Sequence, residues 1–261
     1  MKRPDGPSVR HGVFAWMAVA VALALAVGAA YGFWSTTAQS DLLYLASLLE
    51  SDQRVAVDTV HKYAAATSAI VADDVCRGDV LAAGLTVVLA DLDTRNAAAD
   101  YDGWSAAMVA ADRYLTHAVT CQPTNGNIWA RLAMVRQAEA ENPDELAHLM
   151  DRSAWYAPAE RGVITARCVV WRKAADRTLE LARQSLDHDL LTVLTYFSAT
   201  DATDCLRQAG PKLQSIVAED AKAIAGDRLR LLRRGGIDWL DAPPEPERDR
   251  LSPLAVLPPA T

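Results

Sequence analysis

The stretch that decides the fold runs from Ala110 to Pro158 and reads AADRYLTHAVTCQPTNGNIWARLAMVRQAEAENPDELAHLMDRSAWYAP. Its apolar residues recur at intervals of three and four, which is the spacing of helices that bury one face. Two breaks interrupt the pattern: a Pro-Thr-Asn-Gly turn at 123–126, and Asn142 followed by Pro143, a helix cap with proline at the first helical position. The stretch therefore predicts the end of one helical hairpin followed by one complete hairpin.

The spacing of small and large residues here resembles the tetratricopeptide repeat, a helical hairpin of 34 residues. The second helix of that repeat packs closely through small residues and ends before a proline. Four positions match this second helix and the proline after it: Ala111, Leu115, Ala118 and Pro123. Three more match the start of the next repeat: Trp129, Leu132 and Ala133. Three later positions depart from it: Arg136 replaces an aromatic residue, Glu145 replaces a small residue, and Pro158 comes one residue late. The resemblance thus covers about one repeat, and a generic helical bundle is the alternative.

The resemblance implies a short solenoid of stacked hairpins with a curved surface lined by the first helices. In the register of the family, four residues of the Trp129 helix face that surface: Asn127, Ala130, Met134 and Gln137. We therefore predict that these four residues contact a partner, whereas the simpler alternative is that they are merely exposed or pack on a neighbouring helix.

The segment from Val13 to Trp34 contains no charged residue. As a helix it spans about 33 Å, enough for the hydrocarbon core of a bilayer. Basic residues precede it, and the first one after it is Arg54, so the N-terminus is expected in the cytoplasm. The predicted order is a cytoplasmic N-terminus (1–12), a transmembrane helix (13–34), a periplasmic domain (35–240) and a Pro-rich tail (241–261), in the bacterial inner membrane.

A cleaved signal peptide is the alternative to this anchor, because Gly28 with Ala30, or Thr36 with Ala38, has the small-residue spacing of a cleavage site. The uncharged run is longer than the usual apolar core of a signal peptide, which favours an uncleaved anchor. Small residues also recur every four positions at Ala20, Ala24, Gly28 and Gly32. This stripe would allow a homodimer through the membrane helix, although an alanine-rich anchor explains it equally.

Charge and composition restrict the partners and the fold class. Residues 35–261 carry 23 Lys and Arg against 32 Asp and Glu, which argues against a nucleic-acid partner. Abundant alanine and few aromatic residues favour an all-α domain. Its later helices are expected at 175–186, 189–198, 201–208, 212–225 and 227–234, the last closed by Gly235 and Gly236. The β-branched run from Val163 to Trp171 leaves a strand as an alternative.

The tail from Asp241 onward holds six of the twelve prolines. A segment of this composition builds no core of its own, so it is predicted to be disordered. The sequence PPEPER at 243–248 matches a proline-rich docking motif, PxxP followed by a basic residue, as an alternative role.

The four cysteines form no CxxC pair, which argues against a structural zinc site. In an oxidising compartment disulfides are expected instead. Cys76 precedes a helix that we expect Asp79 to cap, and Cys121 ends the helix that runs back. An antiparallel hairpin brings these two ends together, so we predict a Cys76–Cys121 disulfide. A second bridge between Cys168 and Cys205 has less geometric support, and four buried thiols are the alternative.

No catalytic pattern is present in the sequence. His117 and Cys121 have the spacing of metal ligands on one helix, but no HExxH or similar module supplies further ligands, so no metal and no cofactor are predicted. There is no GxSxG nucleophile turn and no Gly-rich phosphate loop. An enzyme is therefore not expected.

The overall layout, an anchor followed by an acidic helical body with the turn from Cys121 to Trp129, also resembles membrane-anchored accessory proteins of bacterial surface-polysaccharide biosynthesis and export. That resemblance implies a scaffold that binds another cell-envelope protein. Two alternatives remain: a structural stator that dimerises through its anchor, and an enzyme of unrecognised type with a pocket of perturbed titratable groups.

Overall fold

The structure, a computed structural model, describes the backbone of residues 9–240; the side chains of residues 9–15, 31, 34–36 and 38 lie outside the description. The described residues form helices joined by short segments, without a β-strand. The all-α prediction is confirmed, and the β-branched run from Val163 to Trp171 is helical. The tail prediction for 241–261 and the prediction for residues 1–8 fall outside the described residues. The chain divides into two compact units, Met1–Ala110 and Ala111–Thr261.

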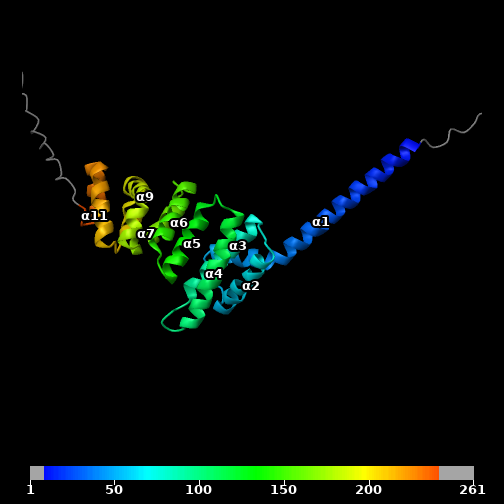
Figure 1. The fold of residues 1–261 in the computed structure, drawn as a ribbon, viewed down its shortest axis with the longest axis horizontal. Helices are drawn as coiled ribbons and strands as arrows, with labels where there is room; N and C mark the ends of the chain where they lie inside the picture. Colours follow the sequence, from blue (N-terminus) through cyan, green and yellow to red (C-terminus); the bar gives the residue numbers. More distant parts are fainter. Residues whose placement is uncertain (1–8, 241–261) are drawn as a thin grey trace, which may run out of the picture. The chain divides into compact units, whose positions relative to one another are not determined.

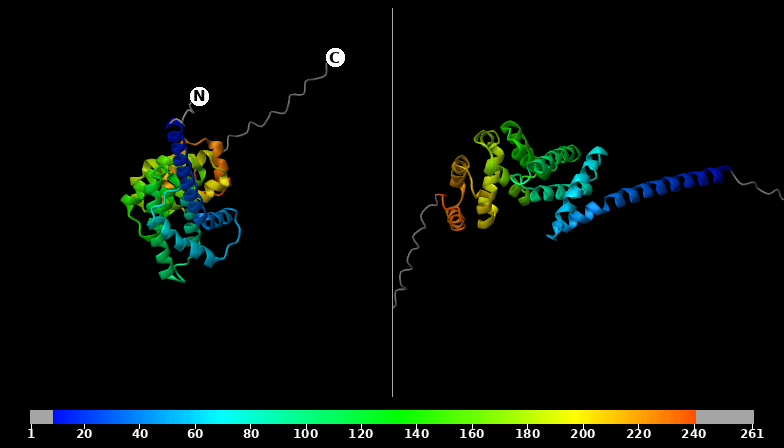
Figure 2. Two further views of the ribbon diagram at one scale, coloured as in Figure 1. Left: turned by 90° about the vertical axis from the view of Figure 1, so that its right-hand side faces the viewer. Right: turned by 90° about the horizontal axis from the view of Figure 1, so that it is seen from below.

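The first helix, α1 (Val9–Glu50), joins the uncharged segment to the start of the folded body without a break. No proline and no pair of glycines interrupts the sequence at this junction. Every described side chain between Trp16 and Ala30 is exposed, on all faces of the helix. Figure 2 shows this part of α1 as a long blue rod.

Within the described part of the chain, no helix is long and apolar enough to cross a membrane. The span predicted at 13–34 includes side chains that are not described, so its insertion into a bilayer stays a prediction. The last turns of α1 differ from the earlier ones because they bury Leu42, Leu45 and Ala46.

The rest of the first unit packs around α3 (Gly78–Thr94), which lies against both α1 and α2 (Val57–Ala72). Because two helices cover it, α3 is apolar over most of its surface, and Val80 and Val87 are completely buried. The predicted cap at Asp79 is wrong, since the helix begins one residue earlier after Arg77 and has no side-chain cap. Asp79 instead lies in the first turn and binds the Arg77 guanidinium, which lowers the pKa of the carboxyl group.

The boundary between the two units falls within α4 (Tyr101–Cys121). The second unit continues with α5 (Gly126–Glu139), α6 (Pro143–Tyr156), α7 (Arg161–Lys173), α8 (Asp176–Leu181), α9 (Arg183–Tyr196), α10 (Ala199–Leu206), α11 (Pro211–Asp220), the 3-10 helix η1 (Ala221–Ala223) and α12 (Gly226–Arg234). The helix expected at 175–186 is divided at Ala182, where the backbone leaves helical geometry, and the one expected at 212–225 ends in η1.

Figure 1 shows helices of the second unit lying beside one another, and we group them into two rows by the helices that they contact. In the first row α5 packs on α7, α7 on α10 and α10 on α12. In the second row α6 packs on α8 and α9, and both of these pack on α11. The second unit is therefore held together by helices that pack on others further along the chain.

The local signals of the central hairpin are confirmed. The Asn125 side chain caps α5 by accepting a hydrogen bond from the amide of Asn127 (3.1 Å), and Asn142 caps α6 with Pro143 at its first position. The indole of Trp129 donates to the carbonyl of Pro123 (2.8 Å), which fixes the turn between α4 and α5.

Gly126 is required at the close approach of two helices. An added Cβ there would lie 2.5 Å from the Cβ of Ala157, so a larger residue would separate α5 from the end of α6. At the end of α12, Gly236 has φ 117, a conformation that other residues rarely adopt, as the prediction of a glycine stop implies.

Candidate functional site

The four residues predicted to contact a partner lie on α5, but the structure fills the space that they were expected to line. Ala130 is completely buried in a cluster with Ala157, Val163 and Ala166, and Met134 packs against this cluster. Ala130 thus offers no surface to a partner in this structure.

The other two predicted residues also make contacts within the domain. The side-chain amide of Gln137 donates to the carbonyl of Val170 on α7 (3.1 Å). Asn127 is partly exposed, and its backbone amide contributes to the cap of α5. These contacts make α5 part of the first row, and partner binding by its residues stays a prediction.

The pair left open by the sequence, Cys168 and Cys205, forms a disulfide with Cα atoms 5.2 Å apart. It joins α7 to α10, two neighbouring helices of the first row, and both side chains are buried. Cys76 and Cys121 belong to different units, and their predicted bridge stays a prediction. His117 and Cys121 lie side by side as their spacing implies, with Nε2 and Sγ 3.5 Å apart.

A groove of about 600 Å³ lies on the second row, between the end of α6 and the helices α8 and α9. We name it the α6–α9 groove. Residues from these helices line it: Asp151, Ala154, Trp155, Pro158, Leu181, Gln184, Ser185 and His188. Trp155 lies at the edge of this groove and is 79% exposed, although tryptophan is ordinarily well buried. An exposed aromatic side chain beside a hollow of this size is typical of a binding surface.

Two contacts between residues that line the α6–α9 groove hold its polar side chains in place. The hydroxyl of Ser185 donates to Asp151, and the His188 ring contacts the carbonyl of Pro158 (3.1 Å). The serine therefore donates to a carboxylate and the histidine pairs with a main-chain oxygen. Nucleophilic catalysis requires a different order, in which the serine donates to the histidine. The arrangement suits binding through an aromatic side chain, a hydroxyl and an imidazole.

A fully buried polar network lies in the helices that carry this groove. The guanidinium of Arg167 on α7 donates to both oxygens of Asp189 on α9, at 2.7 and 2.6 Å. The same guanidinium donates to Ser153 and to the carbonyl of Ala157 on the other side. Because these partners come from α6 and α9, the network fixes the two walls of the α6–α9 groove relative to each other.

Two further hydrogen bonds complete the network. The indole of Trp171 donates to Asp189 (2.9 Å), and the Ser153 hydroxyl donates to the carbonyl of Gly126 (2.8 Å). The network therefore extends from the start of α5 to α9. The sequence reading missed it, although a signal was present: Arg167 interrupts the apolar run from Val163 to Trp171, where every other helical neighbour is small or apolar.

Comparison of the chain with protein-family models, with curated proteins and with solved structures gives no match.

Proposed function

We propose that this chain is a membrane-anchored periplasmic scaffold, and that its domain of tetratricopeptide-like hairpins, stacked as a short solenoid, binds another cell-envelope protein. The observation that carries the proposal is the pair of helix rows in the second unit, in which each helix packs on the next one of its row. Stacked hairpins of this kind present extended surfaces to other proteins.

The spacing of the hydrogen bonds between hairpins supports a repeat. Eight of them join residues that are 32 to 36 positions apart: Gln137 to Val170, Ala175 to Glu141, Ser185 to Asp151, Lys212 to Glu180, Arg183 to Glu219, Arg228 to Leu194, Arg172 to Asp204 and Thr203 to Gly235. The tetratricopeptide repeat has a period of 34 residues. This agreement supports the proposed repeat.

The exposed apolar surface of α1 supports the anchor. Trp16, Leu25 and Phe33 are all more than two-thirds exposed, on different faces of the helix. A helix that is apolar all round is stable in a hydrocarbon environment, whereas water would solvate it poorly. The distribution of basic residues around the segment gives the orientation, with the helical domain outside the inner membrane.

The disulfide between Cys168 and Cys205 supports the compartment. Disulfides persist in the periplasm and are rare in the cytosol, where thiols are kept reduced. A fusion at the C-terminus tests this part of the proposal: a reporter active only in the periplasm should be active after Thr261. Activity of a cytoplasm-only reporter at the same position would refute the orientation.

The α6–α9 groove is the surface that we assign to the partner. Tryptophan is enriched among the residues that dominate binding energy at protein interfaces. The layout resemblance to accessory proteins of polysaccharide assembly is the reason to search for the partner among envelope-assembly proteins.

The binding test uses the full-length chain in native membranes, with a photoreactive residue in place of Gln184 in the groove. Trp155→Ala should lower the yield of the crosslinked partner at least about tenfold, since such residues contribute 2 kcal/mol or more. Tyr196→Ala is the matched control, because Tyr196 is equally exposed on α9 but lies outside the groove lining. Equal loss in both variants, or no loss in either, would remove the groove from the proposal.

A further inference from the structure

The α6–α9 groove brings an aromatic ring and a carboxylate together on one helix. Asp151 and Trp155 both line it, and four positions separate them on α6. Residues at this spacing are neighbours on the surface of a helix, with Cβ atoms about 5–6 Å apart. Both residues are exposed. The groove therefore offers a flat aromatic face and a negative charge to the same ligand.

The carboxylate of Asp151 has no cation beside it within the described part of the chain. The hydrogen bond that it accepts from Ser185 uses Oδ1, and no described residue donates to Oδ2. Arg152 follows it in sequence but does not line the groove, and Arg183 on α9 binds two other carboxylates. The charge of Asp151 is therefore available to a cation from another molecule.

The hydrogen-bond donors of the groove are largely used, whereas acceptors remain. The Ser185 hydroxyl donates to Asp151. The Nε2 atom of His188 lies 3.1 Å from the carbonyl oxygen of Pro158, and because that oxygen only accepts, Nε2 carries the proton. In the neutral ring Nδ1 is then an acceptor. Apart from Gln184, which can donate as well as accept, the polar lining thus suits a ligand that is rich in donors.

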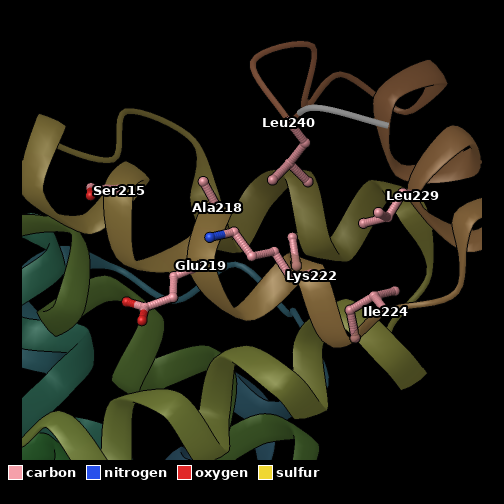
Figure 3. Close-up of a pocket in the computed structure, with 8 residues that line it drawn as sticks. Ser215, Ala218, Glu219, Lys222, Ile224, Leu229 and Leu240 are labelled. Carbon is pink, nitrogen blue, oxygen red and sulfur yellow. The ribbon is translucent and has the colours of Figure 1, made fainter. Parts of the chain in front are cut away.

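A second groove of the second unit, of about 650 Å³, lies at α11, η1 and α12 and has a different character (Figure 3). Residues of both charges line it, and Figure 3 labels them as Glu219 and Lys222. Among the residues that the structure describes, none that lines this groove is aromatic. A groove with both charges favours neither sign, so the α6–α9 groove is the one whose chemistry selects a ligand.

We infer that the partner inserts an arginine side chain into the α6–α9 groove, stacked on Trp155 and paired with Asp151. A guanidinium group is planar, carries only N–H donors, and stacks on aromatic faces. A cation within about 6 Å of an indole centre is attracted by the ring, and the spacing of Asp151 and Trp155 allows both contacts at once. Ala154, Pro158 and Leu181 supply apolar surface for the methylene stem of the arginine.

This inference rests on the proposed role of the groove in partner binding. Two matched peptides test it on the full-length, detergent-solubilised chain. One is a short blocked peptide with a single arginine between alanines, and in the other citrulline replaces the arginine, which keeps the shape and removes the charge. The indole N–H resonance of Trp155, assigned by its loss in Trp155→Phe, reports binding. The arginine peptide should bind about tenfold more tightly, because it gains both the ion pair and the contact with the ring.

Asp151→Asn isolates the charge, because asparagine keeps an oxygen that accepts from Ser185. The arginine peptide should bind this variant about threefold more weakly, and the citrulline peptide should bind as before. Asp144→Asn is the matched control, since Asp144 is exposed on the same helix seven positions earlier and does not line the groove. Equal affinity of the two peptides for the parent chain would overturn the inference, as would equal loss in the two asparagine variants. A lysine peptide that binds as tightly as the arginine peptide would overturn the choice of arginine.

The crosslinking experiment with Trp155→Ala separates this result from the proposed function. Loss of the crosslinked partner in Trp155→Ala, together with equal binding of the two peptides, would keep the proposed function and overturn the inference. An unchanged crosslinking yield in Trp155→Ala would refute the use of the groove by the partner, whatever the peptides show. With the photoreactive residue at position 184, Asp151→Asn should lower the yield of the crosslinked partner about threefold, and Asp144→Asn should leave it unchanged.

Discussion

Arg167 and Asp189 form a bidentate ion pair whose side chains are 0% and 1% exposed. The pair joins the first row of helices to the second. The guanidinium of Arg167 also donates to the Ser153 hydroxyl and to the carbonyl of Ala157, and the indole of Trp171 donates to Asp189. A charge buried in this way is tolerated because its partner and its hydrogen bonds replace water. Removal of either partner would therefore leave a buried charge without its counterion.

Removal of one partner should be strongly destabilising. Arg167→Met leaves the Asp189 carboxylate buried without its counterion, and we expect the free energy of unfolding to fall by about 3–5 kcal/mol. Arg167→Met with Asp189→Leu removes both charges and should be less destabilising than the single change. Urea denaturation followed by circular dichroism measures both. The exposed pair of Lys212 and Glu180 is the control, and Lys212→Met should leave the midpoint nearly unchanged. A double variant that is less stable than Arg167→Met would contradict this account.

The disulfide between Cys168 and Cys205 should stabilise the second unit. It joins residues separated by 37 positions, for which the chain-entropy description gives at most about 4 kcal/mol. Cys168→Ala with Cys205→Ala should lower the free energy of unfolding by about 2–4 kcal/mol. Because both sulfurs are buried, a mild reductant should leave the bridge intact until the chain is partly unfolded. Rapid reduction in the native protein would contradict the buried position.

The predicted bridge between Cys76 and Cys121 is tested by peptide mapping of non-reduced protein whose thiols are blocked at lysis. Its closed loop of about 46 residues corresponds to about 4 kcal/mol in the chain-entropy description. Recovery of the linked Cys76–Cys121 peptide would support the sequence argument and the oxidising compartment. Blocked thiols at both positions would remove the bridge, and Cys121 linked to Cys168 or Cys205 would contradict both the predicted and the observed pairing.

Asp220 at the end of α11 should make stability depend on pH. Burial raises the pKa of its carboxyl group to about 6, with repulsion from Asp187 and Glu219 in the same direction and Arg183 opposing. In the unfolded chain an aspartate titrates near pH 4. The folded chain therefore binds the proton more tightly, so this group adds stability as the pH falls from about 6 to about 4.

Asp220→Asn should accordingly raise the free energy of unfolding at pH 7. Solvent screens part of the cost of the charge, which leaves about 1 kcal/mol for this substitution. The difference between the variant and the parent chain should shrink as the pH falls from about 6 to about 4, because the carboxyl group becomes protonated first in the folded state and then in the unfolded state. Thermal unfolding of the two chains between pH 4 and 7 measures this difference. A difference that is constant with pH would exclude Asp220 as its source.

The sequence by itself determined the elements whose causes are local. Asn142 caps α6, Pro143 begins that helix, and Gly236 lies just after the end of α12. Each of these depends on a few neighbouring backbone groups, so the residue type at one position is sufficient to predict it. The all-α class followed from composition and helical spacing for the same reason.

Only the tertiary structure decided which faces of the helices are buried in the core and which are exposed to solvent. Ala130 and Met134 were expected to face a partner, but they pack against the neighbouring hairpin, since α7 approaches α5 closely through Ala166. The pairing of Arg167 with Asp189 joins two helices through residues 22 positions apart in the chain, and the exposure of Trp155 likewise depends on which helices pack beside α6. Helical spacing identifies an apolar face, but the packing of the next hairpin decides whether that face becomes core or surface.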